Sequence, residues 1–260
     1  MRKKNQNHLT DQELEEEMKS WDTERASELI KSSLKERRIT IKCKSKTQKE
    51  VIKQIEEKDI SIVIGPPGTG KTYLSCAKAL KLLKDDPFKY KKIVLIKSVN
   101  APKDEEIGYL KGTLQEKMEM YVYPFMSNFE KVIGKSAVSD LKMAGAIEIL
   151  PIKFALGVTL DNSIVLIDEA QQISKDNLRT LITRIGSDSK MIFLGDVKQK
   201  SVNKHQKSAL EILLEHFSDV PEIGIVKLSG TDIVRHPIIK KLEEIFEKID
   251  QQENLNGSKK

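Results

Sequence analysis

Residues 65–72 read Gly65-Pro66-Pro67-Gly68-Thr69-Gly70-Lys71-Thr72 and match the phosphate-loop pattern G-x-x-x-x-G-K-[ST] at every fixed position. Glycines in such a loop let successive backbone N–H groups turn inward and surround the phosphates of a nucleotide. The lysine reaches the β- and γ-phosphates, and the following hydroxyl holds Mg²⁺. The pattern therefore predicts a nucleoside triphosphate site that includes Lys71 and Thr72.

The sequence on either side of the loop has the form that the motif requires. Residues 61–64 (Ser-Ile-Val-Ile) are typical of a short buried strand, and residues 73–80 continue as a helix. The positive end of that helix would face the phosphates. A chance match in a Gly/Pro-rich turn is the alternative, and the strand and helix argue against it.

The composition bounds the class of protein. With 260 residues, 38% of them hydrophobic and 32% charged, we expect one sizeable α/β core with extensions. No apolar run approaches the roughly 20 residues that cross a bilayer, and the N-terminus lacks the apolar core of a signal peptide. Two cysteines give no disulfide framework, so we expect a reducing, cytoplasmic location. The net charge of +6 permits a polyanionic partner without proving one.

Short apolar segments alternate with helical patterns along the rest of the chain. The expected strands are 93–96, 147–152, 163–167, 191–194 and 223–228, and helical patterns include 210–217 and 238–249. This order predicts an α/β fold with a mainly parallel sheet and helices on both faces. Residues 38–44 also alternate as a strand would, with Ile39, Ile41 and Cys43 on one face.

Three regions are expected to lie outside that core. Residues 1–38 are predicted to form an N-terminal helical extension, and residues 251–260 a disordered tail. Residues 100–124 contain Pro102 and Pro124 and glycines at 108 and 112, and are expected to be irregular. The domain boundaries are thus placed at 1–38, 39–250 and 251–260.

Polar residues follow two of the predicted strands. Asp168 and Glu169 end one strand, where Asp168 would support Mg²⁺ and Glu169 would act as the general base toward water. Gln199 follows another, and would sense the γ-phosphate or orient the water. Asp196 would hold Gln199 or a metal-bound water. Open α/β sheets bind ligands at the carboxyl ends of their strands, where all of these residues would lie, so we expect them to form one site.

A cation placed beside the transferred phosphoryl group stabilises the negative charge that develops in the transition state and so accelerates the reaction. Arg184 and Arg235 are the candidates for this role, and either is equally compatible with a structural surface position.

An ordered set of motifs points to a family. It comprises residues 47–49, 65–73, 110–117, 168–171, 183–186, 195–199 and 232–237. Over roughly residues 39–249 the chain resembles the PhoH-like ATPases, relatives of the nucleotide-binding domain of superfamily 1 helicases. The resemblance implies a single RecA-like P-loop NTPase domain. One departure is the segment Phe154 to Leu160, where the family pattern has an arginine-rich turn.

The resemblance also implies residue roles and partners. Gln48 would read adenine, which makes ATP the substrate. Arg235 would complete an ATP site, either in its own chain or in that of a neighbouring subunit. The second case implies a homo-oligomer such as a hexameric ring. The implied nucleotide-binding residues are Gln48, Gly65, Pro66, Pro67, Gly68, Thr69, Gly70, Lys71, Thr72 and Tyr73. The catalytic set is Lys71, Glu169, Gln199 and Arg235, and the Mg²⁺ ligands are Thr72 and Asp168.

Three functions remain open at this stage. The first is an ATPase coupled to single-stranded nucleic acid, with RNA favoured over DNA. Lysines at 42–53 and 89–92 and the aromatic residues Tyr90, Tyr121, Tyr123 and Phe125 are its candidate contacts. The second is a nucleotide-dependent assembly module that acts on a protein partner. The third, a small-molecule kinase, would need a lid and an acceptor pocket.

Overall fold

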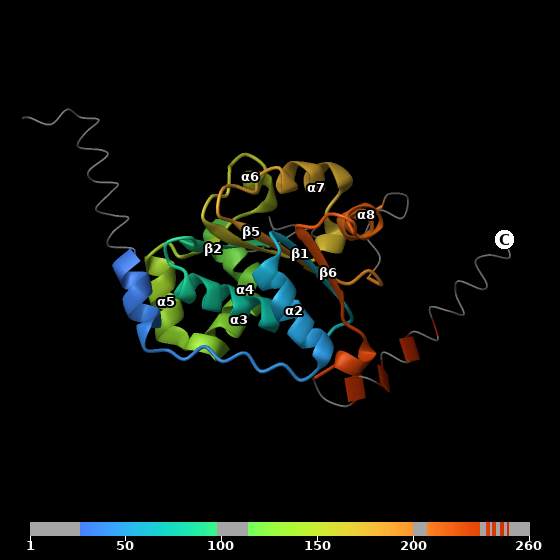
Figure 1. Ribbon diagram of the computed structural model, residues 1–260, viewed down its shortest axis with the longest axis horizontal. Helices are drawn as coiled ribbons and strands as arrows, with labels where there is room; N and C mark the ends of the chain where they lie inside the picture. Colours follow the sequence, from blue (N-terminus) through green and yellow to red (C-terminus); the bar gives the residue numbers. More distant parts are fainter. Residues whose placement is uncertain are drawn as a thin grey trace, which may run out of the picture.

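The protein is described from a computed structural model, shown in Figure 1. The structure describes residues 27–97, 114–199 and 207–234, with the backbone alone for 114–121, and several positions between 238 and 249. Most of the predicted N-terminal extension, residues 98–113, Arg235 and the predicted tail lie outside the described residues.

One six-stranded sheet forms the centre of the molecule, and every described strand pairing is parallel. The strands are β1 (Ile60–Ile64), β2 (Lys92–Lys97), β3 (Ile147–Ile149), β4 (Ser163–Asp168), β5 (Lys190–Gly195) and β6 (Ile223–Lys227). Their order in the sheet is β3-β2-β4-β5-β1-β6. The α/β class is confirmed. A single strand, β5, separates the strand before the phosphate loop from the strand that ends in the two carboxylates.

Helices cover both faces of the sheet (Figure 1). On one face lie α2 (Lys46–Glu57), α3 (Lys71–Asp85), α4 (Leu114–Ile133) and α5 (Lys135–Met143), together with helical residues 27–35. On the other lie α6 (Ile152–Ala155), α7 (Lys175–Ile182) and α8 (Ala209–His216). Successive apolar residues of β1, β2, β4 and β5 alternate between two buried clusters, as in β5, where Ile192 faces the first cluster and Phe193 the second. Burial on both faces explains why these strands are almost entirely apolar.

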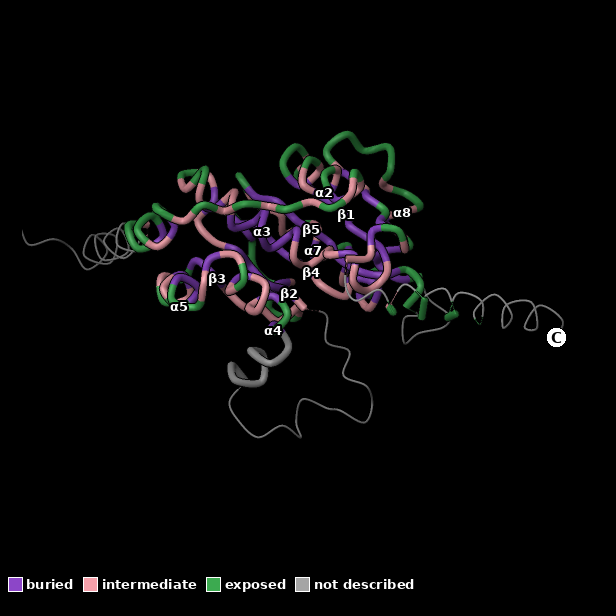
Figure 2. Tube along the Cα trace, turned by 90° about the horizontal axis from the view of Figure 1, so that it is seen from below, coloured by how far each residue is buried: buried purple, intermediate pink, exposed green. Residues whose placement is uncertain are grey.

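The predicted strand at 38–44 is wrong, although its alternation is real. Residues 37–44, which we call the strap, are extended but pair with no described strand. Ile39, Ile41 and Cys43 are partly buried and pack against the cluster that includes α2, α3 and α4, whereas the residues between them are exposed. Figure 2 colours the chain by this burial. A strap that crosses helices buries every second side chain as a strand does, but finds no backbone partner.

The expected irregular stretch is also wrong in part, because α4 begins at Leu114 and contains Pro124. A proline inside a helix lacks one backbone N–H and normally bends or breaks the helix. Here the helix continues past it, and Val122, Phe125 and Phe129 are completely buried in the core. Burial of three large side chains outweighs the local preference of one proline.

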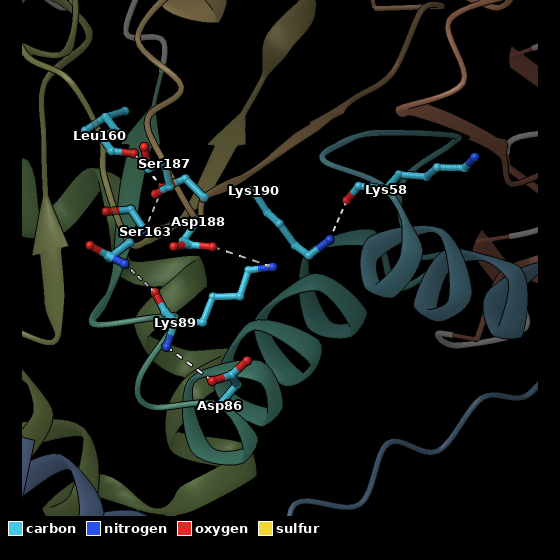
Figure 3. A network of polar contacts seen from close by, with 10 residues as sticks. Lys58, Asp86, Lys89, Leu160, Ser163, Ser187, Asp188 and Lys190 are labelled. Atoms are coloured by element: carbon cyan, nitrogen blue, oxygen red, sulfur yellow. Dashed lines mark hydrogen bonds and ion pairs between the residues drawn. The ribbon is translucent and has the colours of Figure 1, made fainter.

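The amino-terminal edge of the sheet is closed by polar contacts between loops (Figure 3). Lys190 Nζ donates to Lys58 O at 2.6 Å, and Asn162 Nδ2 donates to Lys89 O at 2.9 Å. Burial lowers the pKa of the Lys190 ammonium. These contacts join residues at or just before the starts of β1, β2, β4 and β5. Among the described helices, none is long and apolar enough to cross a membrane.

Two leucines of the helix at 27–35 test whether it belongs to the core. Leu34 is 1% exposed and Leu29 is 39% exposed. We expect Leu34→Ala to lower the free energy of unfolding by about 2–5 kcal/mol, because it removes buried methyl groups and leaves a cavity. Leu29→Ala is the matched control, with an expected change within about 0.5 kcal/mol. Equal effects in denaturant titrations would show that this helix does not pack on the domain.

Candidate functional site

The phosphate loop joins β1 to α3, and its shape requires glycine at particular positions. Gly65 has φ +152°, and a Cβ there would lie 2.6 Å from Leu228 O. Gly70 has φ +88° and precedes the first turn of α3. Lys71 Nζ donates to the carbonyls of Gly65 and Pro66. The loop is thus held in a curled form that exposes the start of α3, where backbone N–H groups attract anions.

A cavity of about 430 Å³ lies against this loop at the carboxyl edge of the sheet. Six of the predicted loop residues line it: Pro67, Gly68, Gly70, Lys71, Thr72 and Tyr73. Asp168, Glu169, Asp196 and Gln199 line it from the ends of β4 and β5. Gly65, Pro66 and Thr69 lie in the loop without lining the cavity. The structure thus brings together the two halves of the site that were predicted separately.

The two carboxylates lie at the end of β4. Burial raises the pKa of Asp168 above its ordinary value, and the neighbouring Glu169 carboxylate raises it further, while Lys97 and Lys71 oppose the shift. Glu169 has φ +53°, a backbone conformation that is uncommon and strained for a residue other than glycine. Asn162 and Asp188, which do not line the cavity, have similar φ values, so the conformation alone assigns no role to Glu169.

The residue types fit a magnesium ion. Mg²⁺ prefers oxygen ligands and takes one or two carboxylates together with phosphate oxygens and water. Thr72 and Asp168 offer a hydroxyl and a carboxylate to the same cavity. Within the part of the chain that the structure describes, no group of three His, Cys, Asp or Glu side chains forms a closed metal site.

Gln171 was quoted in a motif but given no role, and the structure places it behind the cavity wall, in contact with residues that line it. Its side chain is 2% exposed. Its Nε2 donates to Glu169 Oε2 at 2.6 Å and to Gln199 Oε1 at 3.3 Å, and its Oε1 accepts from Asp196 N at 3.3 Å. One carboxamide therefore ties the predicted base to the predicted water-orienting residue.

Of the two roles expected for Asp196, a side-chain contact with Gln199 is not found among the described contacts, and the contact with a metal-bound water stays a prediction. Asp196 Oδ1 accepts from Lys198 N at 3.0 Å, so the carboxylate stabilises the turn after β5. Gln199 is contacted by Gln171 and, through its backbone N–H, by Asp196 O.

Gln48 lies behind the phosphate loop and not on the cavity wall. It is 2% exposed; its Nε2 donates to Thr69 O at 3.0 Å and its Oε1 accepts from Lys44 N at 2.6 Å. A further contact reaches Asp232 O at 3.5 Å. In this arrangement the carboxamide joins the strap, the phosphate loop and the chain after β6.

Of the two arginine candidates, the structure describes only Arg184. Arg184 lies after α7, where its Nε donates to Thr180 O at 3.4 Å, and it is not among the cavity residues. Arg235 lies outside the described residues, although Val234 N donates to Gly68 O of the phosphate loop at 3.0 Å. The divergent segment at 154–160 does not line the cavity either.

Sequence reasoning missed the opposite wall. Lys97 from β2 and Pro124, Asn128 and Lys131 from α4 line the same cavity. Three of these belong to a helix whose first part was expected to be irregular, and Lys97 looked like an ordinary strand end. No local pattern signals such a wall, because it forms only when α4 packs beside α3.

Comparison with known proteins now identifies the family. The family model described as "PhoH-like protein" matches residues 40–247. The chain belongs to the PhoH-like protein family. It is 37% identical to the PhoH-like protein of Bacillus subtilis over 210 residues, which cover 80% of this chain and 65% of that protein. The PhoH-like protein of Synechocystis is 33% identical, over 80% of this chain and 62% of that protein.

The chain thus spans somewhat less than two thirds of the length of these curated relatives. Among solved structures, the large terminase from a thermophilic bacteriophage aligns with a TM-score of 0.45 and 13% identity, over 77% of this chain and 49% of that one. The family and the phosphate loop together make this a nucleotide-binding P-loop domain.

Gln171 gives a testable prediction. We expect Gln171→Ala to lower the turnover of nucleotide roughly ten- to a hundredfold, as is usual when the group that orients a reacting residue is removed. Nucleotide affinity should change little, because Gln171 does not line the cavity. Gln172→Ala, on the same short helix η2 (Ala170–Gln172), is the control. Equal turnover in the two variants would exclude the orienting role.

The buried Asp168 gives a prediction about pH. Its raised pKa means that the native protein holds this proton more tightly than the unfolded chain does. The stability it contributes is therefore present below about pH 3.8 and lost as the pH rises through the native pKa. Without nucleotide or metal, Asp168→Asn should have a larger free energy of unfolding than the wild type at pH 7.

The difference should shrink as the pH falls toward the ordinary pKa of an aspartate. Denaturant titrations at several pH values measure it, with the exposed Asp219→Asn as the control. A less stable Asp168→Asn at pH 7 would contradict the electrostatic account.

Proposed function

We propose that this chain binds ATP with Mg²⁺ and hydrolyses it. We further propose that hydrolysis is coupled to single-stranded nucleic acid, with RNA favoured over DNA. One observation carries the proposal. A single cavity of about 430 Å³ is lined by the phosphate loop, by Asp168 and Glu169, and by Gln199. This combination is suited to binding a triphosphate and directing water at its last phosphorus.

The residues divide the work by position. Lys71 and the loop N–H groups bind the β- and γ-phosphates, and Thr72 and Asp168 hold Mg²⁺, which neutralises phosphate charge when bound. Glu169 accepts a proton from water as the water oxygen bonds to the γ-phosphorus, and Gln199 orients that water. The bond from the γ-phosphorus to the bridging oxygen breaks, which gives ADP and inorganic phosphate.

The choice of adenine rests on the family resemblance. Gln48 would read the base, yet in the structure its amide atoms bond to Thr69 O and Lys44 N. Both N–H groups of the Gln48 carboxamide have acceptors in Thr69 O and Asp232 O, whereas Oε1 accepts only from Lys44 N among the described contacts. Adenine recognition would therefore use the second acceptor site of Oε1. Action of Arg235 from a second subunit, and the homo-oligomer that it implies, are likewise proposals from the resemblance.

Exposed lysines support the nucleic-acid partner. Lys42 and Lys44 of the strap point away from the core, and Lys46, Lys49 and Lys53 are exposed on α2. Such a basic surface attracts the phosphates of a nucleic acid. Burial argues against two of the four aromatic residues that were expected to stack on bases. Tyr90 is 3% exposed and Phe125 is completely buried, so of these two neither can stack on a base; Tyr123 is exposed.

A protein partner is the second candidate, and a specific surface favours it. Ile238, Leu242, Ile245, Phe246 and Ile249 recur at helical spacing and are between 42% and 59% exposed. An apolar helix face of this kind is suited to packing against protein.

Steady-state ATP hydrolysis with and without single-stranded RNA or DNA, at low and physiological salt, separates these functions. Lys71→Ala is the blank, because it removes the ammonium group that binds the β- and γ-phosphates. We expect RNA to stimulate turnover and the stimulation to fall as salt rises, because phosphate contacts are salt-dependent. Hydrolysis that ignores both nucleic acids would contradict the coupling and favour the protein partner. A rate equal to that of Lys71→Ala would contradict hydrolysis itself.

A further inference from the structure

Lys97 is the last residue of β2 and lies next to the carboxylates of the site. It is in register with Asp168 on the neighbouring parallel strand β4. Adjacent strands lie about 4.8 Å apart, and partners in register point to the same face of the sheet. Lys97 is partly buried and lines the cavity together with Lys71 and Asp168. The backbone of the sheet, and not a movable loop, fixes its position.

Positive charge is supplied to this cavity by lysines. Within the described residues, the cationic side chains that line it are Lys71, Lys97 and Lys131. Lys71 belongs to the phosphate loop and contacts the carbonyls of Gly65 and Pro66. Lys131 is an exposed residue near the end of α4. Lys97 is the cation that the sheet holds beside Asp168, and its positive charge opposes the rise in the pKa of that carboxyl group.

Phosphoryl transfer gains most from a cation fixed where negative charge develops, because such a group needs no reorganisation during the reaction. A lysine at the end of a central strand meets this condition because its backbone is held in the sheet. Lys97 lines the same cavity as Lys71 and Thr72 of the phosphate loop, which is where a triphosphate would bind.

We propose that Lys97 is a further catalytic residue of this site, whose ammonium contacts the terminal phosphate and stabilises the transition state from within the same chain. The inference rests on the proposed hydrolysis of ATP. It assigns to a lysine of the sheet a role for which only arginines were considered from the sequence.

The alternative is that Lys97 serves only as a counter-ion for Asp168. The two roles differ in their response to Mg²⁺. A counter-ion competes with the metal for the carboxylate, so its removal would lower the Mg²⁺ concentration needed for half-maximal rate. A phosphate contact that forms in the transition state lowers kcat when it is removed and leaves the Mg²⁺ requirement unchanged or higher.

Lys97→Gln removes the charge and keeps most of the side-chain length. The control is Lys92→Gln at the other end of β2, where Lys92 pairs with Glu148 at 2.7 Å and lines no part of the cavity. We expect kcat to fall roughly a hundredfold in Lys97→Gln, the usual loss for one fixed charge-stabilising donor. KM should change little, Lys92→Gln should match the wild type, and Lys97→Arg should recover part of the rate.

The outcomes separate this inference from the proposed function. Wild-type kcat in Lys97→Gln overturns the catalytic role and leaves hydrolysis standing. A loss of kcat together with a lower Mg²⁺ requirement also overturns it, in favour of the counter-ion. Loss of phosphate release in Lys97→Gln alone, with an unchanged or higher Mg²⁺ requirement, supports the role. An absence of hydrolysis in the wild type and in all three lysine variants contradicts the proposed function, and this role with it.

Discussion

The site depends on a close backbone approach at Gly195, the last residue of β5. Gly65 N donates to Gly195 O at 3.2 Å, which fixes the start of the phosphate loop to β5. On the other side of the same residue, a Cβ would lie 2.4 Å from Gln171 Oε1. Because Gly195 has no side chain, the loop after β4 can come near enough for Gln171 to bridge Glu169 and Gln199. The parallel sheet then sets phosphate loop and carboxylates at one edge.

The electrostatics of this edge are unfavourable in the absence of a ligand. Asp168 and Glu169 repel each other in a partly desolvated place, and Lys97 and Lys71 offset only part of that cost. A site arranged in this way is stabilised by what binds it, since cation and phosphates satisfy charges that the protein leaves opposed.

Local sequence patterns predicted the parts of the fold that local physics controls. The phosphate loop, the six apolar strands and the two carboxylates each have a signature in a few neighbouring residues, and the structure confirms them as elements. The strap was misread because alternate burial against helices looks the same as alternate burial in a sheet. Helix α4 was partly missed because Pro124 dominates a local reading, whereas packing by Phe125 and Phe129 decides the outcome. Gln171 belongs to the quoted motif 168–171, but its contacts with Asp196 and Gln199 join residues distant in sequence. The register of Lys97 with Asp168 does the same.

The central claim is that water attacks the terminal phosphate of ATP in this cavity. Hydrolysis in water enriched in ¹⁸O, with Mg²⁺ and analysis of both products by mass spectrometry, tests it most directly. The account predicts one ¹⁸O atom in each inorganic phosphate released and none in ADP, because the bond to the bridging oxygen breaks on the γ-phosphorus side. Incorporation into ADP, or consumption of ATP without labelled phosphate, would contradict it.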